Sequence, residues 1–167
     1  MTDMSARFSL PLLQPGQAQK EMFHNEALVL IDAALHGVAQ AMGDNVPPAS
    51  PAAGQCWIVG DAPVDAWAGM AHRLAAWTAG GWRFVAPVAG MTIWLMDAGL
   101  WALHDGTGWR PGILPASALH VAGRQVVGAQ QSAIADPDGG ASIDGQARSA
   151  IRDILVALRS HGLIATV

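Results

Sequence analysis

Apolar residues recur at helical spacing in the N-terminal region of the chain. Between residues 17 and 43 they follow one another at spacings of three and four, which places them along one side of a helix. These positions are Phe23, Ala27, Leu28, Ile31, Leu35 and Val38. The turn signal Pro15-Gly16 precedes the pattern, and Gly43-Asp44-Asn45 follows it. We therefore predict an N-terminal region over residues 1–45 with one amphipathic helix.

Prolines interrupt the chain directly after this helix. Pro47, Pro48 and Pro51 fall within residues 46–53. Proline has no backbone N–H and a fixed φ, so this stretch cannot form a helix or a central strand. We interpret it as an extended linker that leads to a second domain over residues 54–117.

The second domain contains all seven tryptophans and alternates apolar runs with glycine-rich turns. The tryptophans are Trp57, Trp67, Trp77, Trp82, Trp94, Trp101 and Trp109. Aromatic residues favour strands, and glycine supplies the positive φ of tight hairpins. A weak internal repeat relates residues 54–58 to 90–95, and residues 77–83 to 104–110. These features predict a small antiparallel meander of about six strands, arranged as a barrel or a sandwich.

The third region, residues 118–167, ends in the clearest helical pattern of the chain. Valines around Gly123 predict a short strand, which is followed by a turn over residues 135–140. Ser142 or Asp144 can cap the helix by accepting a backbone hydrogen bond, and Gly162 suits its C-terminal end. We therefore predict an α+β protein whose last module is a strand, a turn and a helix.

Four positions of the C-terminal helix form a heptad seam. They lie at spacings of four, three and four, and they are Ala147, Ile151, Ile154 and Leu158. A single helix of this length is marginal in water, so the seam needs a partner surface. That surface is either the β domain of the same chain or the same helix in other copies. Isoleucine at both kinds of seam position favours trimers, so we predict a homo-oligomer, with a trimer as the expected state.

Composition supports burial against other chains. Apolar residues make up 51% of the sequence and charged residues 13%, whereas a typical soluble domain is about 25% charged. There is too little charge to cover an ordinary monomer surface, and large exposed apolar patches mark contacts with partners. We expect the apolar stripes to be covered by sister copies within a larger assembly.

Other features narrow the class of partner. The net charge is −4 and the nine Lys and Arg residues are scattered, so we expect no nucleic-acid binding. No apolar run reaches the length of about 18 residues that suggests a membrane span, so no membrane insertion is expected. The N-terminus does not resemble a secretory signal, and Cys56 is the single cysteine. Synthesis in the cytoplasm fits these features.

Motifs that carry chemistry are missing from the sequence. There is no Gly-x-Ser-x-Gly nucleophile motif, no phosphate-binding loop and no His-Glu-x-x-His metal motif, so we predict no enzyme, no catalytic residue, no metal and no cofactor. Most tryptophans are expected in the core, because each buries a large area. Trp67 lies in an apparent loop, residues 62–69, and is our candidate for an exposed ring that contacts a glycan.

The N-terminal region contains one long and specific motif. It is Phe8-Ser9-Leu10-Pro11-Leu12-Leu13-Gln14-Pro15-Gly16-Gln17-Ala18-Gln19-Lys20-Glu21, followed by His24-Asn25-Glu26-Ala27-Leu28. With this motif, roughly residues 5–110 resemble an uncharacterised family encoded in the tail or spike regions of phages, prophages and gene-transfer agents of alphaproteobacteria. Residues 133–164 look like a tail module of fibre-like proteins of such elements.

The resemblance implies a virion component, made in the bacterial cytoplasm and carried on a phage or phage-like particle as a tail fibre, a head spike or its base. It implies capsid, neck or tail proteins as partners. Host surface polysaccharide is a further expected partner. The polar residues of the N-terminal motif exceed what an amphipathic helix needs, so we expect them to dock to the particle. They are Pro11, Gln14, Gln17, Lys20, Glu21, His24, Asn25 and Glu26.

Two other functions stay open at this point. One is a carbohydrate-binding module that recognises host capsule or lipopolysaccharide through exposed tryptophan. The other is a glycan-cleaving enzyme, which needs two carboxylates that flank the scissile bond. Asp97 and Asp105 most resemble such a pair, but the sequence does not place them face to face, and Asp105 falls in a predicted hairpin turn.

Overall fold

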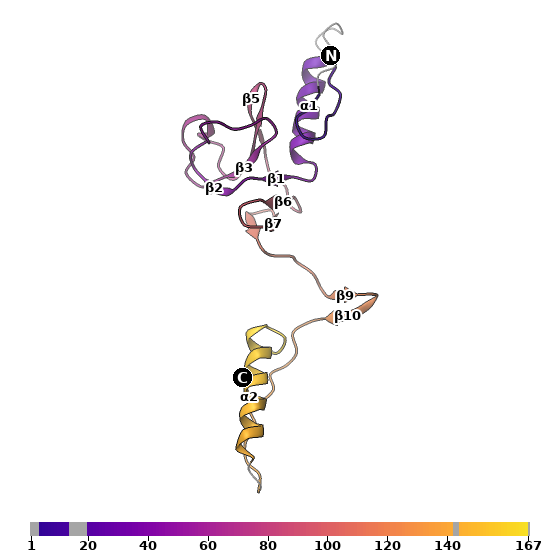
Figure 1. Cartoon of the computed structure of the whole chain (residues 1–167), viewed down its shortest axis with the longest axis vertical. Helices are drawn as coiled ribbons and strands as arrows, with labels where there is room; N and C mark the ends of the chain where they lie inside the picture. Colours follow the sequence, from indigo (N-terminus) through magenta and orange to yellow (C-terminus); the bar gives the residue numbers. More distant parts are fainter. Residues whose placement is uncertain (1–3, 14–19, 142–143, 167) are drawn as a thin grey trace. The chain divides into compact units, whose positions relative to one another are not determined.

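The computed structural model describes residues 4–13, 20–141 and 144–166. The chain divides into two compact units, Met1–Leu114 and Pro115–Val167 (Figure 1). The proline-rich segment 46–53, which we expected to separate two domains, lies inside the first unit. The strand before it and the strand after it pair in one sheet. None of the described helices is long and apolar enough to cross a membrane.

The first helix, α1 (Lys20–Ala34), is shorter than predicted. His36 adopts a positive φ of 45°, and the chain then enters two short strands, β1 (Val38–Ala39) and β2 (Met42–Asp44). A side chain at Gly37 would collide with Ile93, so glycine is required where the chain turns into β1. The predicted helix is therefore wrong beyond Ala34, because sheet pairing of residues 38–44 overrides their apolar spacing.

The strands of the first unit form two mixed sheets of four strands each. The first sheet has the order β2, β3 (Cys56–Val59), β4 (Leu74–Thr78) and β5 (Gly81–Val85). The second has the order β1, β6 (Thr92–Leu95), β7 (Leu100–His104) and β8 (Trp109–Pro111). In each sheet the edge strand from residues 38–44 pairs in parallel, and the other three strands are antiparallel.

This arrangement corrects the predicted single antiparallel meander or barrel. The repeat has the expected hairpins, β4–β5 and β7–β8, but each half forms its own open sheet. The reason lies in residues 38–44, which give one strand to each sheet and so join the halves through parallel edges. Parallel pairing needs a long crossover, and neither a local turn signal nor a period of two reveals it.

One hydrophobic core is shared by the two sheets and by the end of α1. It contains mainly small and branched side chains, with one tryptophan. Its buried members are Ala33, Ala39, Cys56, Ile58, Leu74, Ala76, Ile93, Leu95, Ala102 and Trp109. A second cluster joins Trp57, Val59 and Ala75 of the first sheet to Trp67, which lies between β3 and β4 in the chain, and the half-buried Trp82 packs against it.

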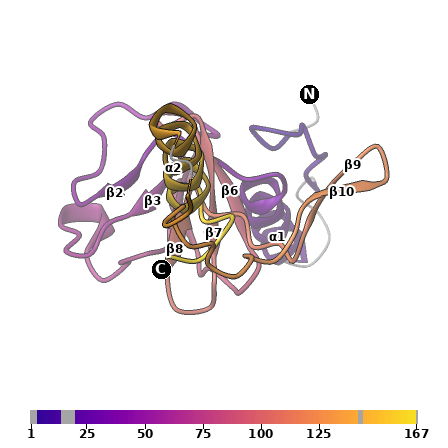
Figure 2. The same ribbon diagram turned by 90° about the horizontal axis from the view of Figure 1, so that it is seen from below.

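The second unit consists of a hairpin, an extended segment and a helix. The hairpin pairs β9 (Leu119–Val121) with β10 (Arg124–Val127), and Figure 2 shows it as a two-stranded ribbon. Helix α2 (Gly145–Ser160) begins at Asp144, whose carboxylate accepts hydrogen bonds from two backbone amides. The predicted cap at Asp144 is confirmed, whereas Ser142 lies outside the described residues. Gly162 has a φ of 69°, as expected for a C-terminal cap.

Candidate functional site

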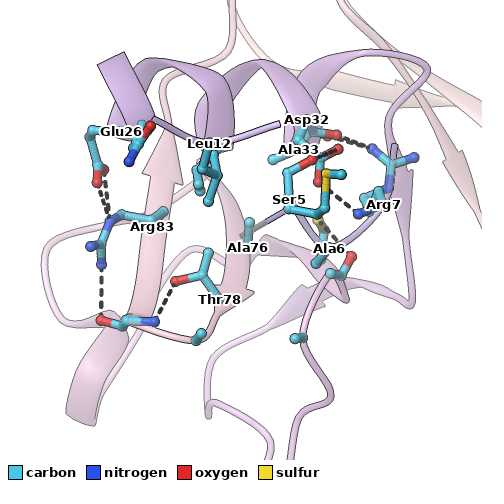
Figure 3. Close-up of a pocket in the computed structure, with 18 of the residues that line it drawn as sticks. Ser5, Ala6, Arg7, Leu12, Glu26, Asp32, Ala33, Ala76, Thr78 and Arg83 are labelled. Atoms are coloured by element: carbon cyan, nitrogen blue, oxygen red, sulfur yellow. Dashed lines mark hydrogen bonds and ion pairs between the residues drawn. The ribbon is translucent and has the colours of Figure 1, made fainter. Parts of the chain in front are cut away.

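A pocket lies between the N-terminal segment, α1 and the β4–β5 hairpin (Figure 3). Its volume is about 460 Å³, within the usual range of small-ligand sites of about 300–1,000 Å³. The lining is mainly apolar, with Leu12 drawn between two polar ends and Cys56 and Ala76 among the residues of the wall.

An ion pair forms one polar end of the pocket. Arg83 Nε lies 2.7 Å from Glu26 Oε1 and 2.9 Å from Glu26 Oε2. The same guanidinium donates to the carbonyl oxygens of Gly80 and Trp82. These contacts tie β5 to α1, and both side chains are partly exposed, so the pair positions the two elements more than it stabilises them.

A buried carboxylate forms the other polar end. Asp32 is 4% exposed, and it accepts hydrogen bonds from Ser5 Oγ at 2.8 Å, from Arg7 N at 2.8 Å and from Phe8 N at 2.6 Å. The Arg7 guanidinium donates to four backbone carbonyls at the C-terminal end of α1, where the helix dipole favours positive charge. Asp32 and Arg7 therefore hold residues 4–10 against the helix.

Sequence reasoning missed this pair. Asp32 lies outside the apolar stripe of the predicted helix. In the structure the polar side of α1 faces the N-terminal segment and β5, as the contacts of Glu26 and Asp32 show. The available signal was a lone carboxylate next to Ala33 within an apolar stretch, but its partners lie some 25 residues earlier.

The apolar stripe of α1 is largely exposed within the single chain. Phe23 is 75% exposed and Ile31 is 50% exposed, and Leu35 just after the helix is 46% exposed. Phe8 of the N-terminal segment is also exposed. This stripe is a surface without a partner among the described residues of the first unit.

The residues predicted to dock to the particle differ in their contacts and in their exposure. Asn25 accepts a hydrogen bond from Leu13 N and donates one to Leu13 O, and Glu26 binds Arg83. Pro11 and His24 are exposed, and Glu21 is half-buried. Gln14 and Gln17 lie outside the described residues, as does the side chain of Lys20. The part of the motif that is described thus folds onto α1, and its predicted role in docking stays a prediction.

The single cysteine is a core residue. Cys56 is fully buried, and its thiol lies 3.7 Å from the carbonyl oxygen of Gly54. Burial raises the pKa of this thiol to about 11, so it stays protonated at neutral pH. A protonated thiol without access to solvent is a poor nucleophile.

Trp67 is buried, and the prediction that its ring is exposed is wrong. The short helix η1 (Asp65–Trp67) turns the side chain inward, where its exposed fraction is 0%. Its ring centroid lies 6.3 Å from that of Trp57 and 5.2 Å from that of Trp82. The indole N–H has no hydrogen-bond partner among the described residues, so ring packing and not a polar contact holds it there. Trp67 therefore loses its role as a glycan contact.

Trp101 is the exposed tryptophan instead. All seven tryptophans are described, and Trp101, at 49%, has the most accessible side chain. It pairs across the sheet with the half-buried Trp94, with the ring centroids 5.2 Å apart and the planes at 72°. The two rings line a groove of about 280 Å³ together with residues that leave open space, Gly99 and Gly112. The alternation of buried Ile93 and Leu95 around Trp94 was the signal for this outward face.

The predicted seam of α2 is accessible within the second unit. Ile151 is 45% exposed and Ile154 is 59% exposed, Ala147 is exposed, and Leu158 is half-buried. The neighbouring face of the helix is covered by its own chain. Arg148, Arg152 and Arg159 donate to backbone carbonyls of the extended segment that precedes the helix. The unit therefore covers the arginine face and leaves the seam free, and self-association stays a prediction.

The described residues hold no group of three or more His, Cys, Asp or Glu side chains that could bind a metal. Asp105 is placed by a hairpin turn, where its carboxylate accepts hydrogen bonds from Thr107 and Gly108 and pairs with Arg110. These bonds, with that from the Thr107 hydroxyl first, hold the pKa of Asp105 well below its usual range. The carboxylate thus organises the turn.

These features define an α+β protein with two mixed sheets, a tryptophan cluster and a C-terminal helical unit. The chain belongs to a family of proteins of unknown function, DUF2793, whose model matches residues 24–110. The matched span includes most of α1, all seven tryptophans and strands β1 to β7. It leaves out the second unit and the first residues of the N-terminal motif. No curated protein matches the sequence.

Proposed function

We propose that the chain is a structural or adhesive subunit of a phage-like particle, a tail fibre or head spike or the base of one, that works as a homotrimer. The observation that carries the proposal is the free seam of α2 beside a face that the chain covers itself. The assignment to a particle comes from the resemblance of the N-terminal motif and the C-terminal module to such proteins.

The small core of the second unit supports self-association. Among its described residues only Leu155 and Ile164 are buried. A unit of this size cannot be stable on so little buried apolar surface, and oligomerisation is a usual remedy. Burying a side chain such as Ile151 or Ile154 contributes roughly 1.5–3 kcal/mol, and in a trimer this contribution recurs in each chain.

The N-terminal part supplies a plausible attachment surface. The exposed stripe of Phe23, Ile31 and Leu35 lies beside a segment that Asp32 and Arg7 hold in place. A fixed apolar surface loses little conformational entropy when it docks. We assign this stripe, with the polar motif around it, to the contact with another particle protein. Three attached copies that each bind a host surface weakly would then act together.

The first experiment measures the mass of the whole protein by light scattering, with two matched variants of α2. Ile154→Asp places a charge in the seam, and Val156→Asp places the same charge on the opposite side of the helix. The two side chains are 59% and 60% exposed, so any effect on the single chain is similar. We expect a trimer for the natural chain and for Val156→Asp, and dissociation for Ile154→Asp. A monomer at every concentration of the natural chain overturns the trimer.

A second experiment tests the location. Particles released by a bacterium that encodes the chain are labelled with gold-coupled antibody against it and viewed by electron microscopy. We expect label at one fixed place on the particle, and a knockout strain serves as the control. Protein that remains in the lysate while the particles stay unlabelled contradicts the proposal.

Glycan binding is the second candidate, and the accessible face of Trp101 favours it. A flat aromatic ring can stack on a sugar ring, and Trp94 holds Trp101 in a fixed orientation. We expect host capsule or lipopolysaccharide to retain the trimer on a polysaccharide column and Trp101→Ala to abolish the retention. Phe23→Ala, which removes a ring that is 75% exposed on α1, is the control. Equal retention of both variants rules out this face.

A further inference from the structure

We propose that the β9–β10 hairpin is a second self-association element, whose apolar face packs against the hairpins of the other copies in the oligomer. This inference rests on the proposed assembly through α2 and adds a separate surface to it. The occupant of the hairpin face is the same hairpin in a second copy.

The hairpin has an apolar face without cover among the described residues of its own unit. Each residue of β9 and β10 is exposed. The cross-strand pairs place Leu119, Val121 and Val127 on one face together with Arg124, and the three apolar side chains are 53%, 56% and 41% exposed. The other face carries the pair His120 and Gln125. The hairpin is thus amphipathic, as a strand pair is when one face packs against another surface.

The hairpin cannot owe its stability to its two strands alone. A single two-stranded hairpin is marginal in water unless its apolar face packs against something. Its turn holds positive φ at both central residues, 49° at Ala122 and 76° at Gly123, which is the tight turn that fixes the register of a short hairpin. Ala122 is strained there, because a side chain disfavours this conformation. A partner surface is needed to offset that cost.

Continuity with the seam of α2 identifies the partner as another copy. Gln131, four residues after β10 ends, is bound to the segment that follows α2 by hydrogen bonds with Leu163 and Ala165. The base of the hairpin is therefore tethered near the end of the helix at which the seam stops, at Leu158. Symmetry about an axis along the seam places the hairpins of all copies around that axis at the same end of the helices, where they can meet.

The size of the seam gives an independent reason. Two isoleucines, one leucine and one alanine make a small contact, whereas a specific and stable interface buries about 1,200–2,000 Å² in total. The three apolar side chains on this face of the hairpin, Leu119, Val121 and Val127, would enlarge that contact. The face carries one charged residue, Arg124, and charged side chains are uncommon at the centre of an interface.

Disulfide trapping tests the contact directly. Cys56 is buried and its thiol is protonated, so a cysteine introduced on the hairpin is the one accessible thiol of the chain. We expect Val121→Cys to give a crosslinked dimer on a non-reducing gel after mild oxidation of the full-length oligomer. Gln125→Cys, on the opposite face, and the natural chain should stay uncrosslinked under the same conditions.

A second measurement, the dissociation of the oligomer, tests the same contact without an introduced cysteine that could distort the hairpin. The triple variant Leu119→Thr, Val121→Thr and Val127→Thr keeps residues that favour strands but removes the apolar face. We expect the concentration at which the oligomer dissociates to rise about tenfold or more. The control His120→Thr with Gln125→Thr should leave it unchanged.

The outcomes separate the two proposals. An oligomer that shows neither the crosslink nor the shift overturns the hairpin contact and leaves assembly through α2 standing. Crosslinking that is equal for Val121→Cys and Gln125→Cys also overturns it, because the contact then lacks a preferred face. A natural chain that is monomeric at all concentrations overturns assembly itself and the hairpin contact with it.

Discussion

The two units bury their apolar residues in different ways. The first closes a core within one chain, because two sheets and the end of α1 each contribute side chains that are nearly inaccessible, such as Ala33, Ile58 and Ile93. The second unit forms regular elements but leaves most of their apolar residues accessible, including Val121 and Ile154. Both are rich in apolar residues, so composition alone does not say whether a core lies within a chain or between chains.

One hairpin from each unit shows the same difference in burial. Leu74 of β4 is fully buried, because the β4–β5 hairpin belongs to a sheet that shares the core. Leu119 of β9 is 53% exposed, because its hairpin has no further strand among the described residues. The β4–β5 hairpin thus has its partner surface within the first unit, whereas the β9–β10 hairpin needs a partner surface from elsewhere. The changes that test this difference follow in order of decreasing expected effect.

Trp67→Ala should lower the free energy of unfolding more than any other change, and the loss should be confined to the first unit. The side chain is fully buried between Trp57 and Trp82, and removal of a buried tryptophan costs about 3–5 kcal/mol. Trp101→Ala, at an accessible ring, should cost about 1 kcal/mol or less. Urea unfolding followed by fluorescence measures both. Equal losses would mean that the outer face of the second sheet is also part of a packed surface.

Asp32→Asn should weaken the attachment of the N-terminal segment. An amide at this position cannot accept all three hydrogen bonds from Ser5, Arg7 and Phe8 with the strength of a carboxylate, and a lost buried bond costs about 1–3 kcal/mol. Amide hydrogen exchange should accelerate in residues 4–10 while the strands of both sheets stay protected. Uniform acceleration across the unit would show instead that the segment is part of the common core.

Dilution should lower the stability of the second unit and leave that of the first unit unchanged, without any mutation. If the second unit is stabilised by assembly as a trimer, each tenfold dilution lowers its stability by roughly 1 kcal/mol per chain. The first unit should not respond, because its core lies within one chain. Hydrogen exchange at several protein concentrations measures both units in one sample. Protection of α2 that does not depend on concentration would contradict the contrast between the units.

The features that were predicted correctly from the sequence are local ones, which depend on neighbouring residues. The cap at Asp144, the glycine at position 162 and the β4–β5 and β7–β8 hairpins were predicted and are present. Each depends on hydrogen bonds or backbone angles within a few residues, so a short window of sequence contains the information.

The features that were missed depend on distant partners. Trp67 was placed on the surface because its loop lacks alternation, but its position is decided by packing on Trp82. The end of α1 was placed too late because residues 38–44 pair with strands far along the chain. For the same reason the bond between Arg7 and Asp32, which builds one end of the pocket, was not found.

The smallest expected effect is a pH dependence that belongs to the first unit alone. Hydrogen bonds from Thr107, Gly108 and Arg110 hold the pKa of Asp105 well below its ordinary value of 3.8. A carboxyl group whose pKa is lower in the folded state stabilises that state above the ordinary value. This contribution is lost as the pH falls toward the lowered pKa. In an NMR titration the Asp105 carboxyl carbon should therefore change shift well below pH 3.8. Asp105→Asn should make the first unit slightly less stable at neutral pH, and the difference should vanish in acid. A midpoint for Asp105 near 3.8 would mean that the turn is open in solution and that its bonds do not contribute.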